Sequence, residues 1–203
     1  YVLHVASPLA LENHTEDYFV KPAVEGAMRA LKFAKKHNVK KVVLTSSVAA
    51  IFETGIEKVD YDENDWSDPD NPKISNYAKS KTLAEKAAWD FLDQEDNPFE
   101  FAVINPALVI GPSLSGDLGV SNFAIEMVVT GKMPVAIPLQ FGFVDVRDVA
   151  TAHILAMENT ESNGERFALA ESDLWYRDIA NLLRKNGFDK APTFSVPVLS
   201  LIH

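Results

Sequence analysis

The chain has 203 residues, of which 47% are hydrophobic and 24% are charged, and this composition is typical of a soluble globular protein with a substantial core. Its formal net charge of -10 argues against a nucleic-acid partner or an anionic membrane surface, because both need clustered lysine and arginine. The absence of cysteine excludes disulfides, thiolate zinc sites and cysteine nucleophiles.

The sequence contains no apolar segment near the roughly 20 residues that span a bilayer. No basic-then-apolar signal peptide opens the chain either. We therefore expect a cytoplasmic protein without a membrane partner. The chain begins at Tyr1, without methionine and inside an expected strand, so we expect that upstream sequence is absent here.

The first half of the chain alternates strands with a helix. A short apolar strand over Tyr1–Ala6 is expected to end at Ser7-Pro8, since proline cannot continue a central strand. A helix is predicted over Tyr18–Lys36, followed by a β-branched buried strand over Lys41–Ser47. A strand, a helix and a second strand within about 45 residues form a βαβ unit, which indicates a parallel sheet.

The next segment, residues 48–75, is expected to be a loop with an acidic centre. An EF-hand counted from Asp60 would need glycine at the sixth position and glutamate at the twelfth, but Asp65 and Asn71 stand there. We therefore predict no metal site and interpret the segment as a solvated acidic loop with Trp66 directed inward.

An alanine-rich helix follows and opens with Asn76-Tyr77-Ala78-Lys79-Ser80-Lys81. Tyr77 and Lys81 are four residues apart, so they share one helix face. An ammonium about 4 Å from a phenol lowers the phenol pKa by roughly 3 units, which would make Tyr77 a general acid near neutral pH. The spacing by itself also fits a solvated helix lysine beside a tyrosine that packs at the helix start.

Ser47 strengthens the catalytic interpretation because it closes a buried strand, and open α/β sheets place their sites at the carboxyl ends of strands. A serine there can donate to a substrate carbonyl oxygen while Tyr77 delivers the proton. The next strand, Phe99–Ile104, ends at Asn105-Pro106. A cofactor that lay across this edge would contact all three strand ends, including Ser7.

Past Gly131, short apolar pieces alternate with helices, which predicts a smaller lobe. His153 has no second histidine three to five residues away, so we interpret it as a packed or surface residue rather than a ligand. Asp145, Arg147 and Asp148 are interpreted as caps and ion pairs between lobes. The helices predicted here run from Ser121 to about Thr130, from Val149 to Glu158 and from Leu174 to Lys185, with caps at Ser121, Asp148 and Ser172 or Asp173.

Six stretches carry a resemblance to a known family, in family order over nearly the whole chain. They are Leu3-His4-Val5-Ala6-Ser7-Pro8, Val42-Val43-Leu44-Thr45-Ser46-Ser47, Tyr61-Asp62-Glu63-Asn64-Asp65-Trp66, Asn76-Tyr77 through Trp89, Asn105-Pro106 through Gly111-Pro112, and Val144-Asp145-Val146-Arg147-Asp148-Val149-Ala150. The chain resembles the extended short-chain dehydrogenase/reductases. Within them it is most similar to the subgroup of dihydroflavonol 4-reductases, cinnamoyl-CoA reductases and NADPH-dependent aldehyde or methylglyoxal reductases.

The resemblance implies an α/β fold with two parts. Residues 1–112 would form a Rossmann-like doubly wound parallel sheet that lacks its N-terminal βαβ part. Residues 113–203 would mostly form a smaller α/β substrate-binding lobe, with segments that return to the core. The implied cofactor is NADPH or NADP, with NADH as an alternative, and the implied partner is a small-molecule carbonyl substrate.

The resemblance also assigns roles to particular residues. Ser47 would polarise the carbonyl, Tyr77 would be the acid, and Lys81 would lower the tyrosine pKa while bonding the nicotinamide ribose. Leu9 and Phe52 would line the substrate pocket with Ser47 and Tyr77, which favours an apolar carbonyl compound. Cofactor contacts are implied at Val5, Ala6, Ser7, Tyr77, Lys81, Pro106, Ala107, Leu108, Val109 and Ser121.

The family's glycine-rich G-x-x-G-x-x-G turn, which holds the pyrophosphate and selects NAD or NADP, has no counterpart in these residues. The spacing of Gly116 and Gly119 is nearest, but no suitable strand-to-helix turn follows it. The family's last strands and helices also lack a counterpart before the final residue, His203. We favour a fragment of a complete reductase over a product that binds its cofactor weakly, and the NADP preference comes from the subgroup alone.

Two other functions remain open from the sequence. Nucleotide-sugar epimerases and dehydratases use a similar serine, tyrosine and lysine on the same scaffold, although the apolar pocket candidates favour a reductase. A non-catalytic dinucleotide sensor would have no need of Tyr77. A homodimer is a further hypothesis, motivated by the length of the helices over Tyr18–Lys36 and Tyr77–Leu92.

Overall fold

The computed structural model describes residues 1–10, 14–55, 60–116, 119–136 and 139–195. The chain divides into two compact units, and each is described by itself. The first unit comprises Tyr1–Ala107 and Asp148–Leu169, and the second comprises Leu108–Arg147 and Ala170–His203. The boundary that the sequence suggested, after residue 112, falls inside the second unit, and the assignment of functions to the two parts stays a prediction.

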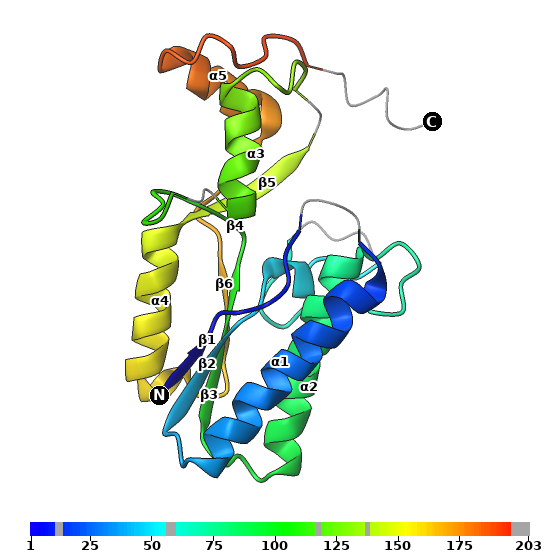
Figure 1. Cartoon of the computed structure of the whole chain (residues 1–203), viewed down its shortest axis with the longest axis vertical. Coiled ribbons are helices and arrows are strands. Elements are labelled where there is room, and N and C mark those ends of the chain that lie inside the picture. Colours follow the sequence, from blue (N-terminus) through cyan, green and yellow to red (C-terminus); the bar gives the residue numbers. More distant parts are fainter. Residues whose placement is uncertain (11–13, 56–59, 117–118, 137–138, 196–203) are drawn as a thin grey trace. The chain divides into compact units, whose positions relative to one another are not determined.

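The first unit is built on a four-stranded parallel sheet with the order β1-β2-β3-β6 (Figure 1). The strands are β1 (Val2–His4), β2 (Lys41–Thr45), β3 (Glu100–Pro106) and β6 (Arg166–Leu169). Each neighbouring pair is parallel. The predicted βαβ unit and the Rossmann-like α/β fold are therefore confirmed.

Helices cover both faces of this sheet, as expected of a doubly wound fold (Figure 1). The helices α1 (Glu16–Lys36) and α2 (Asn76–Gln94) pack on one face, and α4 (Val146–Glu158) packs on the other. Because successive strand residues point to opposite faces, both faces of a central strand must be apolar. The two clusters divide these residues into Val42, Leu44, Phe101 and Val103 on the α1–α2 side, and Val43, Ala102 and Ile104 on the α4 side.

The start of α2 determines where the tyrosine and lysine motif lies. Ser75 is the N-cap, and its side chain accepts a hydrogen bond of 3.1 Å from the backbone N–H of Ala78. Small residues let α1 and α2 approach each other and the sheet closely. The buried alanines at this contact are Ala23, Ala27 and Ala34 of α1 and Ala84 and Ala88 of α2.

The second unit contains a separate three-stranded sheet with the order β4-β5-β7. Its strands are β4 (Leu108–Ile110), β5 (Gln140–Asp145) and β7 (Ser172–Trp175), and its helices are α3 (Gly119–Val129) and α5 (Tyr176–Lys185). The pair β4 and β5 is parallel, whereas β5 and β7 are antiparallel. Val128, Tyr176 and Ala180 form its small apolar core.

Three predicted helix caps are wrong. Ser121 lies inside α3 and Asp148 lies in the first turn of α4, because that helix begins at Val146 directly after β5. Ser172 and Asp173 belong to β7 instead of capping a helix, since they pair with Phe143 and Gly142 of β5. Cap and strand residues are both short and polar here, so only the strand partner distinguishes them.

The strands also differ from their predicted bounds. β1 and β2 are shorter than expected, because the chain turns away after Thr45 into the short 3-10 helix η1 (Val48–Ala50), which Ser47 caps. β6 was not predicted at all. It has only four residues, and buried and exposed positions do not alternate along it. It forms a strand because it pairs with β3, which lies far from it in the sequence.

Two buried polar side chains, His153 and Lys41, make hydrogen bonds that hold the first unit together. His153 is buried, which agrees with the first of the two predicted alternatives, a packed or a surface residue. Its ring forms hydrogen bonds with the Thr45 hydroxyl at 2.6 Å and with the carbonyl of Val149 at 2.8 Å. The η2 turn (Thr160–Ser162) is tied to the sheet through the buried Lys41, whose ammonium donates to Ser162 Oγ at 2.7 Å. Within the described ranges, no group of three His, Asp or Glu side chains could hold a metal ion.

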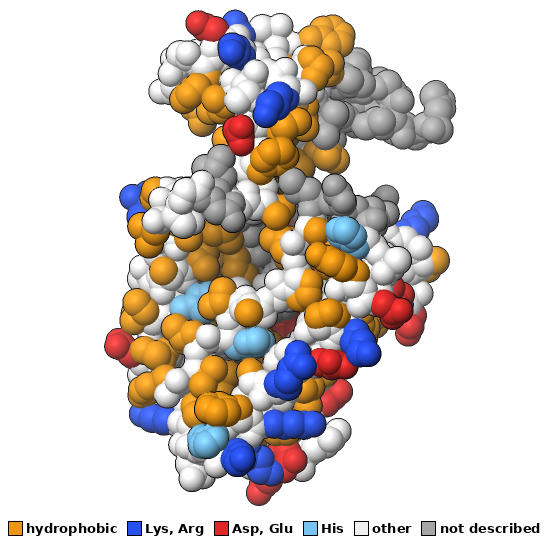
Figure 2. All heavy atoms as spheres, in the orientation of Figure 1, with side chains coloured by type: hydrophobic (Ala, Val, Ile, Leu, Met, Phe, Trp, Pro, Cys, Tyr) orange, Lys and Arg blue, Asp and Glu red, His pale blue; other side chains and the backbone are white. Residues whose placement is uncertain are grey.

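The outer surface of α1 carries charges of both signs. Figure 2 shows Lys and Arg side chains interspersed with Asp and Glu side chains over this helix. Pairs such as Arg29 with Glu25 and Lys79 with Glu16 account for part of this mixture. Among the described residues, no helix is both long and apolar enough to cross a membrane.

We predict that Phe101→Ala destabilises the first unit by about 3–5 kcal/mol, because the ring is 1% exposed and packs edge-to-face against Trp89 beneath α2. The matched control is Phe33→Ala on α1, where the ring is 56% exposed and a change within about 0.5 kcal/mol is expected. Denaturant unfolding measures both. Equal losses in the two variants would contradict this assignment of the core.

Candidate functional site

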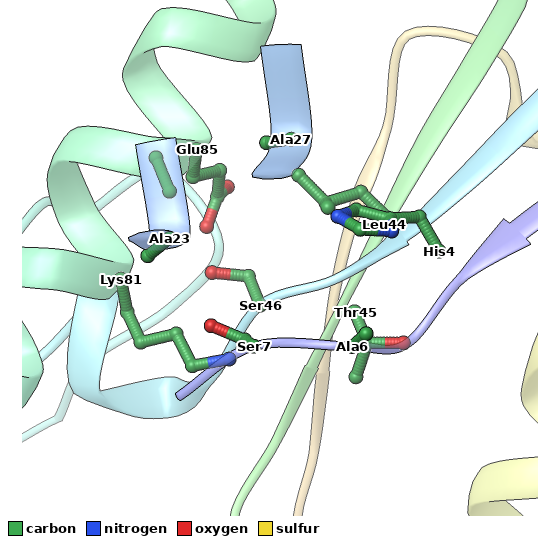
Figure 3. Close-up of a pocket in the computed structure, with 11 residues that line it drawn as sticks. His4, Ala6, Ser7, Ala23, Ala27, Leu44, Thr45, Ser46, Lys81 and Glu85 are labelled. Carbon is green, nitrogen blue, oxygen red and sulfur yellow. The ribbon is translucent and has the colours of Figure 1, made fainter. Parts of the chain in front are cut away.

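The carboxyl ends of β1, β2 and β3 bring several predicted site residues to one edge of the first sheet. A pocket opens there, and Figure 3 shows the side chains of Ser46, Lys81 and Glu85 directed toward the same space. Such an edge is where open α/β sheets bind ligands. The pocket is lined by His4, Ala6, Ser7, Ala23, Ala27, Leu44, Thr45, Ser46, Lys81, Ala84 and Glu85.

Ser47 is held from three directions. Its backbone is extended, and its side-chain oxygen accepts a hydrogen bond of 3.1 Å from the backbone N–H of Ala49. Its hydroxyl lies 3.5 Å from the carbonyl oxygen of Pro106, toward which it donates. Its own carbonyl accepts a hydrogen bond of 3.2 Å from the side-chain amide of Asn105. The end of β3 therefore fixes a serine that follows β2.

Tyr77 lies in the first turn of α2, and its ring meets Phe19 of α1 edge-to-face at 6.3 Å between centroids. Its phenol forms a side-chain hydrogen bond with Ser47. Burial raises the pKa of Tyr77 above its ordinary value, and the hydrogen bond with Ser47 opposes part of that rise. Ser47 and Tyr77, predicted to act together, are therefore in contact.

Lys81 lies one helical turn beyond Tyr77 and is buried, with 7% of its surface exposed. Its ammonium is 5.7 Å from the centroid of the Tyr77 ring. Burial lowers the pKa of Lys81 from 10.5 to about 8, and the negative charge of Glu85 opposes the fall. A fall of this size corresponds to about 3 kcal/mol against the charged form.

The expected lowering of the Tyr77 pKa by Lys81 is not found in this chain. The expected lowering was for a charged lysine about 4 Å from the phenol at an effective dielectric of about 20, without the effect of burial on either group. In the structure both side chains are buried, so desolvation dominates each pKa and acts in opposite directions on the two. The two pKa values therefore move apart compared with the same groups in water, because the pKa of Lys81 falls from 10.5 to about 8 while that of Tyr77 rises above 10.0.

The predicted cofactor and substrate residues divide between the two units. Val5 and Ala6 are exposed just beyond β1, Ser7 lines the pocket, and the Ala107 amide donates to Leu169 in β6. Leu9 and Phe52 are exposed in the first unit, and their contact with a substrate stays a prediction. Leu108, Val109 and Ser121 belong to the second unit, and their contact with a cofactor stays a prediction.

The sequence interpretation missed a buried polar network behind the motif. Glu85, one turn beyond Lys81, is fully buried and accepts hydrogen bonds from Arg166 Nε at 2.5 Å and from Asn105 Nδ2 at 2.9 Å. The guanidinium also stacks on Trp66, 3.7 Å from the ring centroid, and donates to backbone carbonyls of the acidic loop. The loop is therefore anchored near its middle, at Glu63, Asp65 and Trp66, instead of being wholly solvated.

One sequence feature indicated part of this network. Lys81 and Glu85 have the same spacing as Tyr77 and Lys81, so all three lie on one helix face, and a face that carries three ionisable groups is unusual for a helix packed on a sheet. No feature of the sequence indicated that Arg166 belongs to this network. It comes from the unpredicted strand β6, so only the sheet pairing brings it to Glu85.

Comparisons with known proteins agree with this geometry. The NAD dependent epimerase/dehydratase family matches residues 1–170. The chain is 39% identical over 191 residues to cinnamoyl-CoA reductase CAD2 of Medicago truncatula, covering 91% of this chain and 57% of that protein. It is 34% identical over 212 residues to the NADPH-dependent methylglyoxal reductase GRE2 of Saccharomyces cerevisiae, covering 91% of this chain and 60% of that protein.

A solved structure gives the same result for the fold. The crystal structure of Gre2 from Candida albicans in complex with NADPH aligns with a TM-score of 0.82 and 31% identity, over 99% of this chain and 66% of that one. The resemblance to reductases of this kind is therefore confirmed. The chain spans less than two thirds of the length of each of these three relatives.

We predict that Lys81→Met stabilises the first unit at neutral pH by up to about 3 kcal/mol, because it removes a buried ammonium at little cost in shape. The pKa of Lys81 is lower in the folded state than the ordinary 10.5, so the unfolded chain binds more protons between about 8 and 10.5. The advantage of the variant should be complete below about pH 8 and vanish as the pH rises past 10.5.

Unfolding curves recorded across this pH range measure the effect. The matched control is Lys79→Met on the same helix, where the lysine is paired with Glu16 near the surface and no such gain is expected. A Lys81→Met variant that is less stable than the parent at pH 7 would show that the ammonium is not destabilised by burial.

Proposed function

The chain belongs to the NAD dependent epimerase/dehydratase family, and on that premise we propose that the protein is an NADPH-dependent reductase of aldehyde or ketone carbonyls. The observation that carries the proposal is the contact between the Ser47 hydroxyl and the Tyr77 phenol, with the Lys81 ammonium one helical turn beyond. The relative from Saccharomyces cerevisiae is named an NADPH-dependent reductase, which favours NADPH over NADH.

The chemistry of the pocket fits a dinucleotide. Lys81, Ser7 and Ser46 supply donors at the strand ends, and hydroxyl and phosphate oxygens of a nucleotide accept such bonds. The Ser46 hydroxyl is buried and has no hydrogen-bond partner in the described part of the chain. We assign cofactor contacts to Val5, Ala6, Ser7, Tyr77 and Lys81, and to Pro106 and Ala107 at the end of β3. When bound, NADPH supplies the hydride.

Each of the three polar side chains has a distinct task in this proposal. The Ser47 hydroxyl donates a hydrogen bond to the substrate carbonyl oxygen and so stabilises the negative charge that develops there. The Tyr77 phenol gives its proton to the same oxygen, which forms the product hydroxyl. The raised pKa of Tyr77 keeps the phenol protonated at neutral pH, so the proton is present before reduction begins. The Lys81 ammonium then stabilises the phenolate that remains.

The substrate we propose is largely apolar. Leu9 is 48% exposed shortly after Ser7, and Phe52 is 44% exposed shortly after Ser47. Apolar side chains exposed beside a polar catalytic edge are typical of a pocket that buries a hydrophobic ligand and orients it with few polar groups.

The family description also covers epimerases and dehydratases, which is the one observation that favours a different reaction. Incubation with NADPH and a panel of aldehydes, diketones, dihydroflavonols and acyl-CoA thioesters tests the reductase, and binding of UDP-sugars tests the alternative. Cofactor binding without any turnover would instead favour a dinucleotide sensor.

A homodimer through α1 and α2 stays a prediction, which a monomeric mass in solution scattering would exclude.

We predict that Tyr77→Phe lowers kcat for carbonyl reduction by about 10²–10⁴-fold, because the variant keeps the ring against Phe19 and loses only the acidic hydroxyl. The matched control is Tyr18→Phe, which removes an exposed hydroxyl on α1 and should keep the parental rate. NADPH oxidation followed by absorbance measures the rate, and NADPH fluorescence confirms that binding survives. Full turnover by the Tyr77 variant would refute the proposed acid.

We also predict that the reduction rate falls as the pH rises through about 8, because Lys81 loses its proton there. Below that pH the lysine is charged and can stabilise the phenolate, and above it the charge is lost. In Lys81→Arg the guanidinium stays charged throughout this range, so the fall near pH 8 should disappear even where the rate is lower. A profile of kcat against pH that is the same in both proteins would rule out Lys81 as the titrating group.

A further inference from the structure

The buried carboxylate of Glu85 lies in the first unit and has no task in the proposed reaction. It is 0% exposed and lies one helical turn beyond Lys81, on the same face of α2. A buried charge is unfavourable unless its oxygens are paired, and replacing a buried ion pair with apolar residues is often neutral or stabilising. Packing alone therefore gives little reason for a carboxylate at this point, directly behind the lysine.

Glu85 is held in place by a side chain of the strand β6, which pairs with β3. Arg166 of β6 contacts it at 2.5 Å, and the same guanidinium donates to the carbonyls of Glu63 at 2.6 Å and Asp65 at 2.8 Å. The guanidinium plane is fixed further by its stacking on Trp66. Both ends of the ion pair are therefore immobilised, and one carboxylate oxygen is left for another partner.

That partner is Asn105, which connects Glu85 to Ser47. The side-chain amide of Asn105 donates one N–H to Glu85 Oε2 at 2.9 Å and the other to the carbonyl of Ser47 at 3.2 Å. Both neighbours are acceptors, so the amide nitrogen must face them and the amide cannot be reversed. Its oxygen has no hydrogen-bond partner in the part of the chain that the structure describes. The orientation of this buried amide thus depends on the Glu85 carboxylate.

Glu85 also faces the Lys81 ammonium. The charged or titratable groups around Lys81 are Tyr77 and Glu85 on its own helix and His4 from β1, and Arg166 lies behind Glu85. Glu85 is the group whose charge raises the pKa of Lys81 against the effect of burial. Without that negative charge, the unpaired guanidinium would act on Lys81 in the same direction as burial.

We propose that Glu85 is a positioning residue for the carbonyl reduction, which fixes Ser47 through Asn105 and keeps Lys81 charged through its own negative charge. This inference rests on the proposed function, because Ser47 and Lys81 have these tasks only in a reductase. Arg166 acts one step further back by holding Glu85 in place. In this arrangement Glu85, Asn105 and Arg166 do not touch the reacting atoms.

Two substitutions of Glu85 separate the two effects. Glu85→Gln keeps the length of the side chain and removes the charge, so we expect kcat to fall about 10-fold or more and the loss of activity with rising pH to begin at a lower pH. Glu85→Asp keeps the charge and shortens the reach to Asn105, so kcat should fall while the pH dependence stays close to that of the parent. Asn105→Ala, which breaks the same connection from the other side, should resemble Glu85→Asp.

The control for a merely structural effect is Ser162→Ala. It removes the 2.7 Å hydrogen bond that the buried Lys41 donates to Ser162, so a buried charge again loses a partner in the same unit. This variant should lower the melting temperature and leave kcat per folded molecule unchanged. If the Glu85 variants lose activity only in proportion to their folded fraction, as this control does, the proposal is overturned.

A readout without turnover distinguishes failure of this inference from failure of the proposed function. NMR titration of the Lys81 side chain in the full-length protein should give a lower midpoint in Glu85→Gln than in the parent, and an unchanged midpoint in Asn105→Ala. Equal midpoints in the parent and Glu85→Gln overturn the electrostatic part of the proposal. Full activity of Tyr77→Phe would instead refute the proposed acid, while this titration would still test whether Glu85 controls the charge of Lys81.

Discussion

The burial of the Lys81 ammonium is the constraint on which the rest of the site depends. A lysine that is 7% exposed would be neutral near physiological pH unless another charge compensated for its loss of water, and Glu85 is the compensating charge. Glu85 is itself buried and needs Arg166, which in turn needs the carbonyls of the acidic loop and the ring of Trp66. One buried cation therefore explains why a helix, a strand and a loop meet behind the motif.

The burial of the charged Lys81 lowers the free energy of unfolding. The charged form of Lys81 is disfavoured by about 3 kcal/mol relative to water, which is a large fraction of the net stability of a domain. Sites that need perturbed pKa values commonly carry such a cost. The apolar layer beneath the site supplies stabilising free energy that offsets this cost. The buried alanines of α1 and α2 let both helices approach one face of the sheet and exclude water from it, and α4 covers the other face.

The same arrangement connects the proposed chemistry to the fold. In a parallel sheet the carboxyl ends of neighbouring strands meet at one edge, so Ser7, Ser47 and Pro106 come together although they lie far apart in the sequence. The α2 helix then brings Tyr77 and Lys81 to that edge. The reductase proposal depends on this edge alone and not on the second unit, whose predicted contacts to cofactor and substrate are separate proposals.

The sequence by itself determined the elements whose evidence is local. The β-branched runs of β2 and β3, the length of α1 and α2, and the four-residue spacing of Tyr77 and Lys81 all follow from residues that are near one another in the chain, and each is present in the structure. The six family stretches were sufficient to identify the relatives, because a set of motifs in order is far more specific than any one of them.

Only the tertiary structure decided the rest, because it depends on neighbours that are distant in the chain. The strand β6 exists because β3 offers it a partner, and the supposed caps at Ser172 and Asp173 form β7 because β5 does the same. The pKa of Tyr77 rises instead of falling, since burial is a property of the packed fold and outweighs the expected effect of a neighbouring charge. The contact of Glu85 with Asn105 and Arg166 joins residues 20 and 81 positions apart, and no local pattern encodes it.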